Sequence, residues 1–173
     1  MAWKIQSLGE HHLTDQFDCG KERLNTWLKR HALNNMGLGL GRTFVAVETG
    51  NTRVQGFFCV SAGAVKFDHI PEHKKKSLPH YPIPTVHIGR LAVDRQVQRR
   101  GLGSALLVEA LRRAANVSAD VGIYAVDVIA LDEEAKSFYL KYGFTQMLDD
   151  ALHLFLPIAT ARILAATMAG DNG

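Results

Sequence analysis

The sequence lacks the marks of an exported or membrane protein. No apolar run approaches the roughly 20 residues that span a bilayer. The first residues, Met-Ala-Trp-Lys-Ile-Gln, do not follow the charged and then apolar order of a secretory signal. We therefore expect a cytoplasmic protein without a membrane partner.

Cysteine is also scarce. The 2 cysteines among 173 residues, Cys19 and Cys59, are too few for a secreted disulfide scaffold and lack the spacing of a zinc site. We expect two reduced thiols. Four histidines lie in and after a proline-rich stretch, namely His69, His73, His80 and His87. Because Pro71 interrupts their spacing and no carboxylate completes a ligand set, we expect no bound metal.

The composition is typical of a globular protein. Apolar residues make up 47% of the chain and charged residues 21%, and the length suits one domain with a sizeable core. The formal net charge of +3 suits an anionic partner, which includes both phosphorylated cofactors and nucleic acids. The positions of the basic residues must decide between them.

The first half of the chain predicts a helix and a hairpin. Apolar residues at three- and four-residue spacing, among them Leu24, Trp27 and Leu28, form one face of the helix. The expected elements are a helix over Phe17–Leu40, strands over Arg42–Glu48 and Val54–Ala64 joined by a turn at Gly50-Asn51, and a surface loop or short helix over His69–Pro84.

The second half alternates strands with helices. Asp132 is a good N-cap, and Gly143 is a good helix stop. The expected elements are strands over Val86–Val93, Gly122–Leu131 and Phe144–Pro157, and helices over Leu102–Ala115 and from Asp132 to Gly143. This order predicts an α/β (α+β mixed) protein with a mixed sheet flanked by helices. We expect one domain over residues 1–157, followed by a tail or short docked helix over residues 158–173.

One segment indicates a phosphate site. The run Gln98-Arg99-Arg100-Gly101-Leu102-Gly103-Ser104 follows a predicted strand and opens a helix. Its glycines let the backbone approach a ligand, and the first-turn N–H groups, the two arginines and the Ser104 side chain can bind a pyrophosphate. A tight turn beside solvated arginines is the alternative. The pattern is neither the dinucleotide fingerprint nor a P-loop.

This run resembles the acetyl-CoA motif of the GNAT superfamily of N-acetyltransferases, Gln/Arg-x-x-Gly-x-Gly/Ala. Arg90-Leu91-Ala92-Val93 resembles the family's pantetheine-binding strand, and Ala135 to Phe144 resembles its closing helix and turn. The resemblance implies a mostly antiparallel sheet that splays at the acetyl-CoA site. It assigns cofactor binding to Leu91, Ala92, Val93, Gln98, Arg99, Arg100, Gly101, Leu102, Gly103, Ser104 and Ala135.

The same resemblance implies catalytic roles. The backbone N–H of Val93 would donate to the thioester oxygen, and Tyr139 would be the general acid that protonates the leaving thiolate. The alternative for Tyr139 is a core position. No general base stands out, and an amine with a pKa of about 8 needs little help at neutral pH. Scattered candidates are Glu48, His87, Asp94, Asp127 and Glu133.

Several segments resemble a subgroup, the GNAT toxins of toxin-antitoxin pairs. They include Leu13 to Leu28, Gly41 to Val45, Pro82 to Asp94 and Ala130 to Lys136. The resemblance implies that aminoacyl-tRNA is the acceptor, that a ribbon-helix-helix antitoxin is a partner and that the chain forms a homodimer. Basic residues that could contact tRNA phosphates are Lys29, Arg30, Lys74, Lys75, Lys76, Arg90 and Arg95.

Three functions remain open on the sequence alone. The chain is a tRNA-directed toxin, an acetyltransferase for a small-molecule amine or protein lysine, or a cofactor-binding regulator that has lost catalysis. The fold does not choose between them, because one fold hosts many functions. For Lys74 to Lys76 an ordinary solvated loop is the alternative to a nucleic-acid contact.

Overall fold

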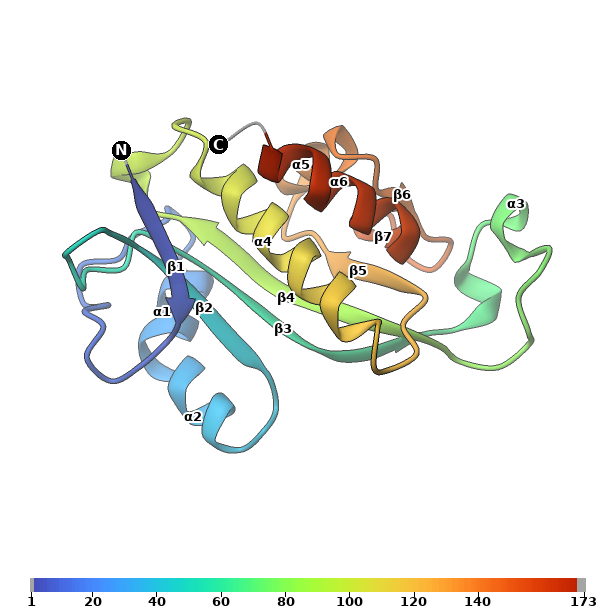
Figure 1. The fold of residues 1–173 in the computed structure, drawn as a ribbon, viewed down its shortest axis with the longest axis horizontal. Helices are drawn as coiled ribbons and strands as arrows, with labels where there is room; N and C mark the ends of the chain where they lie inside the picture. Colours follow the sequence, from blue (N-terminus) through green and yellow to red (C-terminus); the bar gives the residue numbers. More distant parts are fainter. Residues whose placement is uncertain (1, 171–173) are drawn as a thin grey trace. The chain divides into compact units, whose positions relative to one another are not determined.

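The structure, a computed structural model, describes residues 2–170. Figure 1 shows its helices and strands along the chain. They are β1 (Trp3–Ser7), α1 (Glu22–Arg30), α2 (Ala32–Gly37), β2 (Arg42–Glu48), β3 (Gly56–Val65), η1 (Phe67–His69), α3 (Glu72–Lys75), β4 (Ile83–Val93), η2 (Arg95–Val97), α4 (Leu102–Val117), β5 (Ala125–Ile129), α5 (Glu133–Lys141), β6 (Thr145–Gln146), β7 (His153–Pro157) and α6 (Ile158–Gly170).

The strands form a mixed sheet in the order β1-β2-β3-β4-β5-β7-β6. Most of its pairs are antiparallel, whereas β4 and β5 are parallel. The parallel pairing runs from Thr85 and Ala125 to Ile88 and Val128, but β4 continues to Val93. The predicted fold class, a mostly antiparallel mixed sheet flanked by helices, is confirmed.

The chain divides into two compact units, the first of which holds residues up to 61 and residues 89–110. Its core is built around Phe57, which stacks on Trp27 of α1 and meets the edge of Phe17. Helix α2 lies against β2 (Figure 1). Gly56 lies so close to α4 that a Cβ there would be 2.9 Å from Leu106 Cδ1. A larger residue there would have to displace the Leu106 side chain in a close-packed interior.

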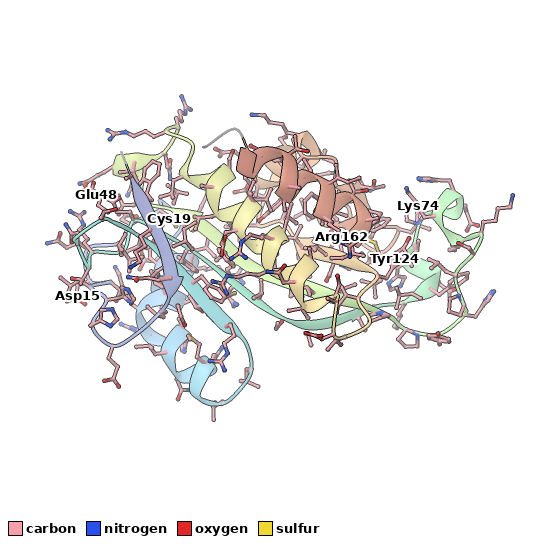
Figure 2. The ribbon with its side chains drawn as sticks, in the orientation of Figure 1. Asp15, Cys19, Glu48, Lys74, Tyr124 and Arg162 are labelled. Carbon is pink, nitrogen blue, oxygen red and sulfur yellow. The ribbon has the colours of Figure 1, made fainter. Side chains whose placement is uncertain are left out.

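The second unit holds residues 62–88 and those from 111 onward. Its core includes Val65, Ile83 and Phe155. The chain after Pro157 forms α6, which contacts β5 and β7 and buries Ala161 and Ala165. Nη2 of Arg162, which is labelled in Figure 2, donates to Ser118 Oγ at 3.1 Å. The predicted division into a domain over residues 1–157 and a tail stays a prediction, and residues 171–173 lie outside the described part.

The predicted helix over Phe17–Leu40 was wrong in extent. Helix α1 begins only at Glu22, because the preceding loop makes long-range hydrogen bonds and Gly20 has a φ of 89°. At His31 the φ of −119° separates α1 from α2. Strand β1 was missed, since its five residues form a short edge strand whose pairing with β2 is long-range.

The last predicted strand, Phe144–Pro157, is two strands joined by a turn. The carboxylate of Asp150 accepts the N–H of Leu152 at 2.8 Å, and this Asx-type turn reverses the chain between β6 and β7. The predicted strand over Gly122–Leu131 is shorter, and β4 starts at Ile83 rather than Val86.

Other predictions are confirmed. Strands β2 and β3 are antiparallel around Gly50, which has a φ of 84°. Asp132 Oδ1 caps α5 by accepting the N–H of Ala135 at 2.9 Å, and Gly143 follows the helix with a φ of 92°. Within residues 2–170, no helix has the length and apolar character to cross a bilayer.

Both cysteines are free, as predicted, and both are buried. Burial raises the pKa of the Cys19 and Cys59 thiols above the ordinary value. Because the thiolate is the reactive form, neither cysteine is an activated nucleophile.

Candidate active site

The predicted phosphate turn lies between β4 and α4 in the first unit. Arg99 has a φ of 64° and Gly101 a φ of 90°, so both have left-handed backbone. Successive residues that include left-handed conformations direct their N–H groups toward a common concavity that binds anions. Since Arg99 carries a Cβ, its conformation costs about 1 kcal/mol or more. A strained residue of this kind is typical of a ligand-binding turn.

The start of α4 completes this turn. Leu102, the first residue of α4, is buried, whereas Arg99, Arg100 and Gly101 are exposed. The N–H of Ala105 makes an early helical bond to Gly101 O at 3.1 Å, which leaves the N–H groups of the first turn directed out of the helix end. A helix of 16 residues also has a positive N-terminal end. The residues present therefore fit a pyrophosphate.

Gln98 ties this turn to two other segments. Its Nε2 donates to Val93 O at 2.9 Å and to Cys19 O at 3.1 Å; Cys19 is labelled in Figure 2. The amide nitrogen of Gln98, a predicted cofactor contact, is thus occupied by backbone carbonyls. The N–H of Asp94 donates to Gln55 O at 2.8 Å, next to β3. Because backbone groups alternate along a strand, those of Val93 face the opposite edge of β4.

Asp18 strengthens the same connection. Its backbone N–H donates to Asp94 Oδ2 at 3.1 Å, and its carboxylate accepts from Arg95 Nε at 3.2 Å and from Asn25 Nδ2 at 2.9 Å. The hydrogen bond from Arg95 is the main reason that the pKa of Asp18 falls to about 2. The segment that resembles the toxin subgroup therefore supports the cofactor turn, a contact across 76 residues that no local pattern indicates.

The predicted tRNA-contacting residues have unlike surroundings. In the first unit, Lys29 and Arg30 are exposed in the last turn of α1, and Arg90 lies 4.2 Å from the centroid of the Trp27 ring. Arg95 pairs with Asp18, as described above.

In the second unit, Lys74 is partly buried on α3 (Figure 2), and Lys76 is exposed. Lys75 pairs with Glu72 at 2.9 Å. Of the seven, Lys29, Arg30 and Lys76 are exposed and take no part in these contacts of Lys75, Arg90 and Arg95. Their contact with nucleic acid stays a prediction.

Tyr139 is buried on α5, with 4% of its surface exposed. Its ring meets Phe138 and Phe144 edge-on, at centroid distances of 5.2 and 5.4 Å. This apolar environment suits a core tyrosine and equally a neutral proton donor shielded from bulk water. Its role as the general acid stays a prediction.

A cluster of histidines and aspartates lies in the second unit. Asp127 of β5 is buried and accepts three hydrogen bonds. The donors are Thr85 Oγ1 at 2.7 Å, His87 Nδ1 at 3.0 Å and His153 Nε2 at 2.8 Å. His153 Nδ1 also lies 2.9 Å from Asp149 Oδ2. His87 and Asp127, two of the scattered base candidates, are thus brought together.

The other three base candidates are separate from this cluster. Glu48 accepts from Gln55 Nε2 at 3.2 Å, Asp94 caps η2, and Glu133 is exposed at the start of α5. Of the four histidines considered as ligands, His80 contacts the Phe67 ring at a centroid distance of 4.2 Å, and Nδ1 of His69 lies 3.8 Å from Asp149 Oδ2. Over residues 2–170, no three His, Cys, Asp or Glu side chains form a group that could hold a metal.

The interactions within the cluster shift the pKa values of His153 and Asp127. The hydrogen bond to Asp127, aided by Asp149 and opposed by burial, raises the pKa of His153 to about 9. Burial alone would raise the pKa of Asp127, but the hydrogen bonds from His153, His87 and Thr85 outweigh it and hold that pKa well below its ordinary value. At neutral pH the cluster therefore contains an imidazolium between two carboxylates.

A mixed sheet with an anion-binding turn between β4 and α4 is the arrangement of an acyl-CoA-dependent acyltransferase. The chain belongs to the GNAT family of acetyltransferases, because the family model described as "Acetyltransferase (GNAT) domain" matches residues 39–146.

Individual relatives extend this likeness over most of the chain. The "tRNA-acetylating toxin" of Mycobacterium tuberculosis is 38% identical over 86% of this chain and 87% of its own. A solved mutant of KacT has a TM-score of 0.90 and 31% identity, and covers 95% of this chain and 99% of its own. AtaT in complex with acetyl-methionyl-tRNAfMet has a TM-score of 0.87 and 29% identity, and covers 94% of this chain and 99% of its own. A mutant of AtaT is also solved with the C-terminus of the antitoxin AtaR. This structure has a TM-score of 0.80 and 27% identity, and covers 94% of this chain and 97% of its own.

Paired substitutions at Arg99 and Arg100 test the strained turn. Arg99→Ala and Arg99→Gly remove the same charge, but only glycine adopts a φ of 64° freely. We expect Arg99→Gly to be more stable than Arg99→Ala by about 0.5–1 kcal/mol in urea unfolding. At Arg100, whose φ is not positive, the glycine variant should be the less stable one. The same order at both positions would contradict a left-handed Arg99.

The His153 cluster predicts a specific pH dependence of stability. A folded pKa of about 9 lies above the unfolded value of about 6.5, so this stabilisation is complete below pH 6.5 and is lost as the pH rises through 9. We expect the free energy of unfolding to fall by about 2–3 kcal/mol across that window. His153→Gln, which cannot titrate, should remove this slope in urea unfolding. An unchanged slope would show that another group causes it.

Proposed function

We propose that this chain transfers the acetyl group of acetyl-CoA to the amino group of aminoacyl-tRNA and thereby acts as a translation-blocking toxin. The observation that carries the proposal is the 38% identity, over 86% of the chain, to a protein named "tRNA-acetylating toxin". The likeness to AtaT in complex with acetyl-methionyl-tRNAfMet supports the same acceptor. Because charged tRNA is found in the cytoplasm, we place the activity there.

On the donor side, acetyl-CoA supplies an activated thioester. The backbone N–H groups at the start of α4, with Gly101 and Gly103 in the turn, would bind its pyrophosphate, and Arg99 and Arg100 would add fixed positive charge. The backbone from Leu91 to Val93 would pair with the pantetheine arm. The N–H of Val93, on the edge of β4 away from β3, would donate to the carbonyl oxygen as it gains negative charge.

Proton supply to the leaving group falls to Tyr139. A thiolate is a good leaving group, but a positioned acid still accelerates its departure by about 10²- to 10⁴-fold. Tyr139 lies one helical turn after Ala135 on α5 and is shielded by the rings of Phe138 and Phe144. This burial favours proton donation to the cofactor sulfur over donation to bulk water.

The partners are proposed on the same basis. The exposed side chains of Lys29, Arg30 and Lys76 would contribute phosphate contacts, which dominate sequence-independent affinity for nucleic acid. A ribbon-helix-helix antitoxin would neutralise the enzyme, supported by the structure of AtaT with the C-terminus of its antitoxin AtaR. We also propose a homodimer as the active assembly.

Acetyl transfer to charged tRNA is the direct test of the acceptor. Incubation with radiolabelled acetyl-CoA and charged tRNA should place label on the aminoacyl group, recovered as the N-acetyl amino acid after mild alkaline hydrolysis. Uncharged tRNA should stay unlabelled, because it lacks the amine. Label on a polyamine or a lysine peptide, with none on charged tRNA, would instead establish the alternative function, acetylation of a small amine or protein lysine.

The acid assignment predicts a separation of binding from turnover. Tyr139→Phe keeps the ring that packs on Phe138 and Phe144 and removes only the hydroxyl. We expect kcat to fall by about 10²- to 10⁴-fold, while calorimetric titration shows unchanged affinity for acetyl-CoA. Tyr142→Phe, on the same segment, serves as the control and should keep turnover. Wild-type turnover in Tyr139→Phe would remove the residue from the mechanism.

A further inference from the structure

His87 is held in one tautomer by a buried carboxylate. Its Nδ1 lies 3.0 Å from Oδ2 of Asp127, whose side chain is only 6% exposed. An ionised carboxylate accepts hydrogen bonds and cannot donate them, so Nδ1 must carry the proton. The other ring nitrogen, Nε2, therefore has a free lone pair when the imidazole is neutral. This is the state that a general base requires.

His153, the other histidine on Asp127, is in a different state. A carboxylate lies at each of its ring nitrogens, Asp127 at Nε2 and Asp149 at Nδ1. Both nitrogens must donate, so His153 is an imidazolium without a lone pair. His153 consequently neutralises one of the two carboxylates, and one net negative charge is left in the cluster that His87 contacts.

The surroundings position the pair of His87 and Asp127. Thr85 Oγ1 donates to the second oxygen of Asp127 at 2.7 Å and fixes the rotation of the carboxylate. A Cβ on Gly63 of β3 would lie 3.1 Å from His87 Cβ and 2.8 Å from Thr85 Oγ1. β3 therefore confines the pair from one side. The ionisable groups around His87 are Asp127 on β5, His153 and Asp149 at β7 and its preceding turn, and His69 on η1 at 3.8 Å from Asp149.

We propose that His87 is the general base of acetyl transfer and that Asp127 is its positioning residue. The inference rests on the proposed acetyltransferase reaction. The protonated acceptor amine first gives one proton to Nε2 of His87, and the neutral nitrogen then bonds to the thioester carbon and releases a second proton to water. The C–S bond breaks, the thiolate takes a proton from the general acid, and His87 later returns its proton to water. No oxidant, reductant or covalent enzyme intermediate is needed.

The position of His87 on β4 agrees with this role. It precedes Leu91, the first residue of the predicted pantetheine-binding segment, by four residues of one strand, which corresponds to about 13 Å of extended chain. A general base acts within hydrogen-bond reach of the proton or through one water, so the proposal requires the acceptor amine to lie between Nε2 of His87 and this segment. The side chain of His87 is 27% exposed, so solvent and ligands can reach it.

Three substitutions separate base catalysis from structure. His87→Asn places its amide nitrogen where Nδ1 donates to Asp127 but has no titratable nitrogen, and His87→Ala removes both functions. We expect both variants to lose about 10²-fold or more in kcat/KM for the acceptor amine at pH 6.5. The loss should shrink toward pH 9, where an amine with a pKa of about 8 is already neutral. His80→Ala, on a histidine that stacks on Phe67, should match the wild type at both pH values.

The outcomes are distinct. A defect in His87→Asn that is equally large at pH 6.5 and pH 9, or no defect at all, would overturn the assignment. If His87→Ala does not fold, as thermal melting would reveal, His87→Asn decides alone. The wild type is assayed in parallel with charged tRNA, a polyamine and a lysine peptide. Failure with charged tRNA overturns only the proposed acceptor, since the pH comparison is then made with whichever amine is acetylated.

Discussion

The turn from Gln98 to Ser104 depends on the hydrogen bonds that Gln98 Nε2 donates. They join the end of β4, through Val93 O, to the loop before α1, through Cys19 O. The turn that follows contains a strained, left-handed Arg99, and such a conformation persists only where the surrounding structure enforces it. Asp18 adds the enforcement, because its backbone and carboxylate bond to Asp94 and Arg95 just before the turn. The cost of the strained backbone is thus offset by bonds outside the ligand site.

This connection changes the meaning of the N-terminal pattern. Cys19-Gly20 and the residues of α1 suggested the acceptor, through a resemblance to toxins. In the structure, the carbonyl of Cys19 and the side chain of Asp18 instead make contacts at the turn from Gln98 to Ser104, through Gln98 and Arg95. Gly20 is needed because its φ of 89° lets the chain leave this contact and enter α1. The contacts of this segment therefore have a structural role at the turn from Gln98 to Ser104, whatever the acceptor is.

Local patterns were predictable and long-range ones were not. The turn from Gln98 to Ser104, the Asp132 cap and the Gly50 hairpin each depend on neighbours in sequence, and each lies where the sequence indicates. The break at His31 and the short strand β1 depend on tertiary packing, which overrides helix propensity and edge-strand patterns.

The candidate base shows the same division. His87 and Asp127 are 40 residues apart and meet because β4 and β5 pair in a parallel register that sets them side by side. His153 reaches the same carboxylate from β7, which pairs with β5 in the opposite direction. Residue type alone identified two of these side chains as candidates, but their coupling required the register of three strands. A shift of one residue in any of them would place its side chain on the other face of the sheet.

Unlike environments also separate the two proposed proton-transfer groups. Tyr139 lies among aromatic rings and, as the proposed acid, would give up its phenolic proton. His87 borders an ionised network and, as the proposed base, would accept a proton. A single enzyme can run both steps at one pH only if its acid and base differ in this way, because identical surroundings would drive both groups toward the same protonation state. In the proposed mechanism the excess carboxylate of the Asp127 cluster would stabilise the imidazolium that His87 becomes during transfer, whereas the groups that surround the Tyr139 ring include the uncharged rings of Phe138 and Phe144.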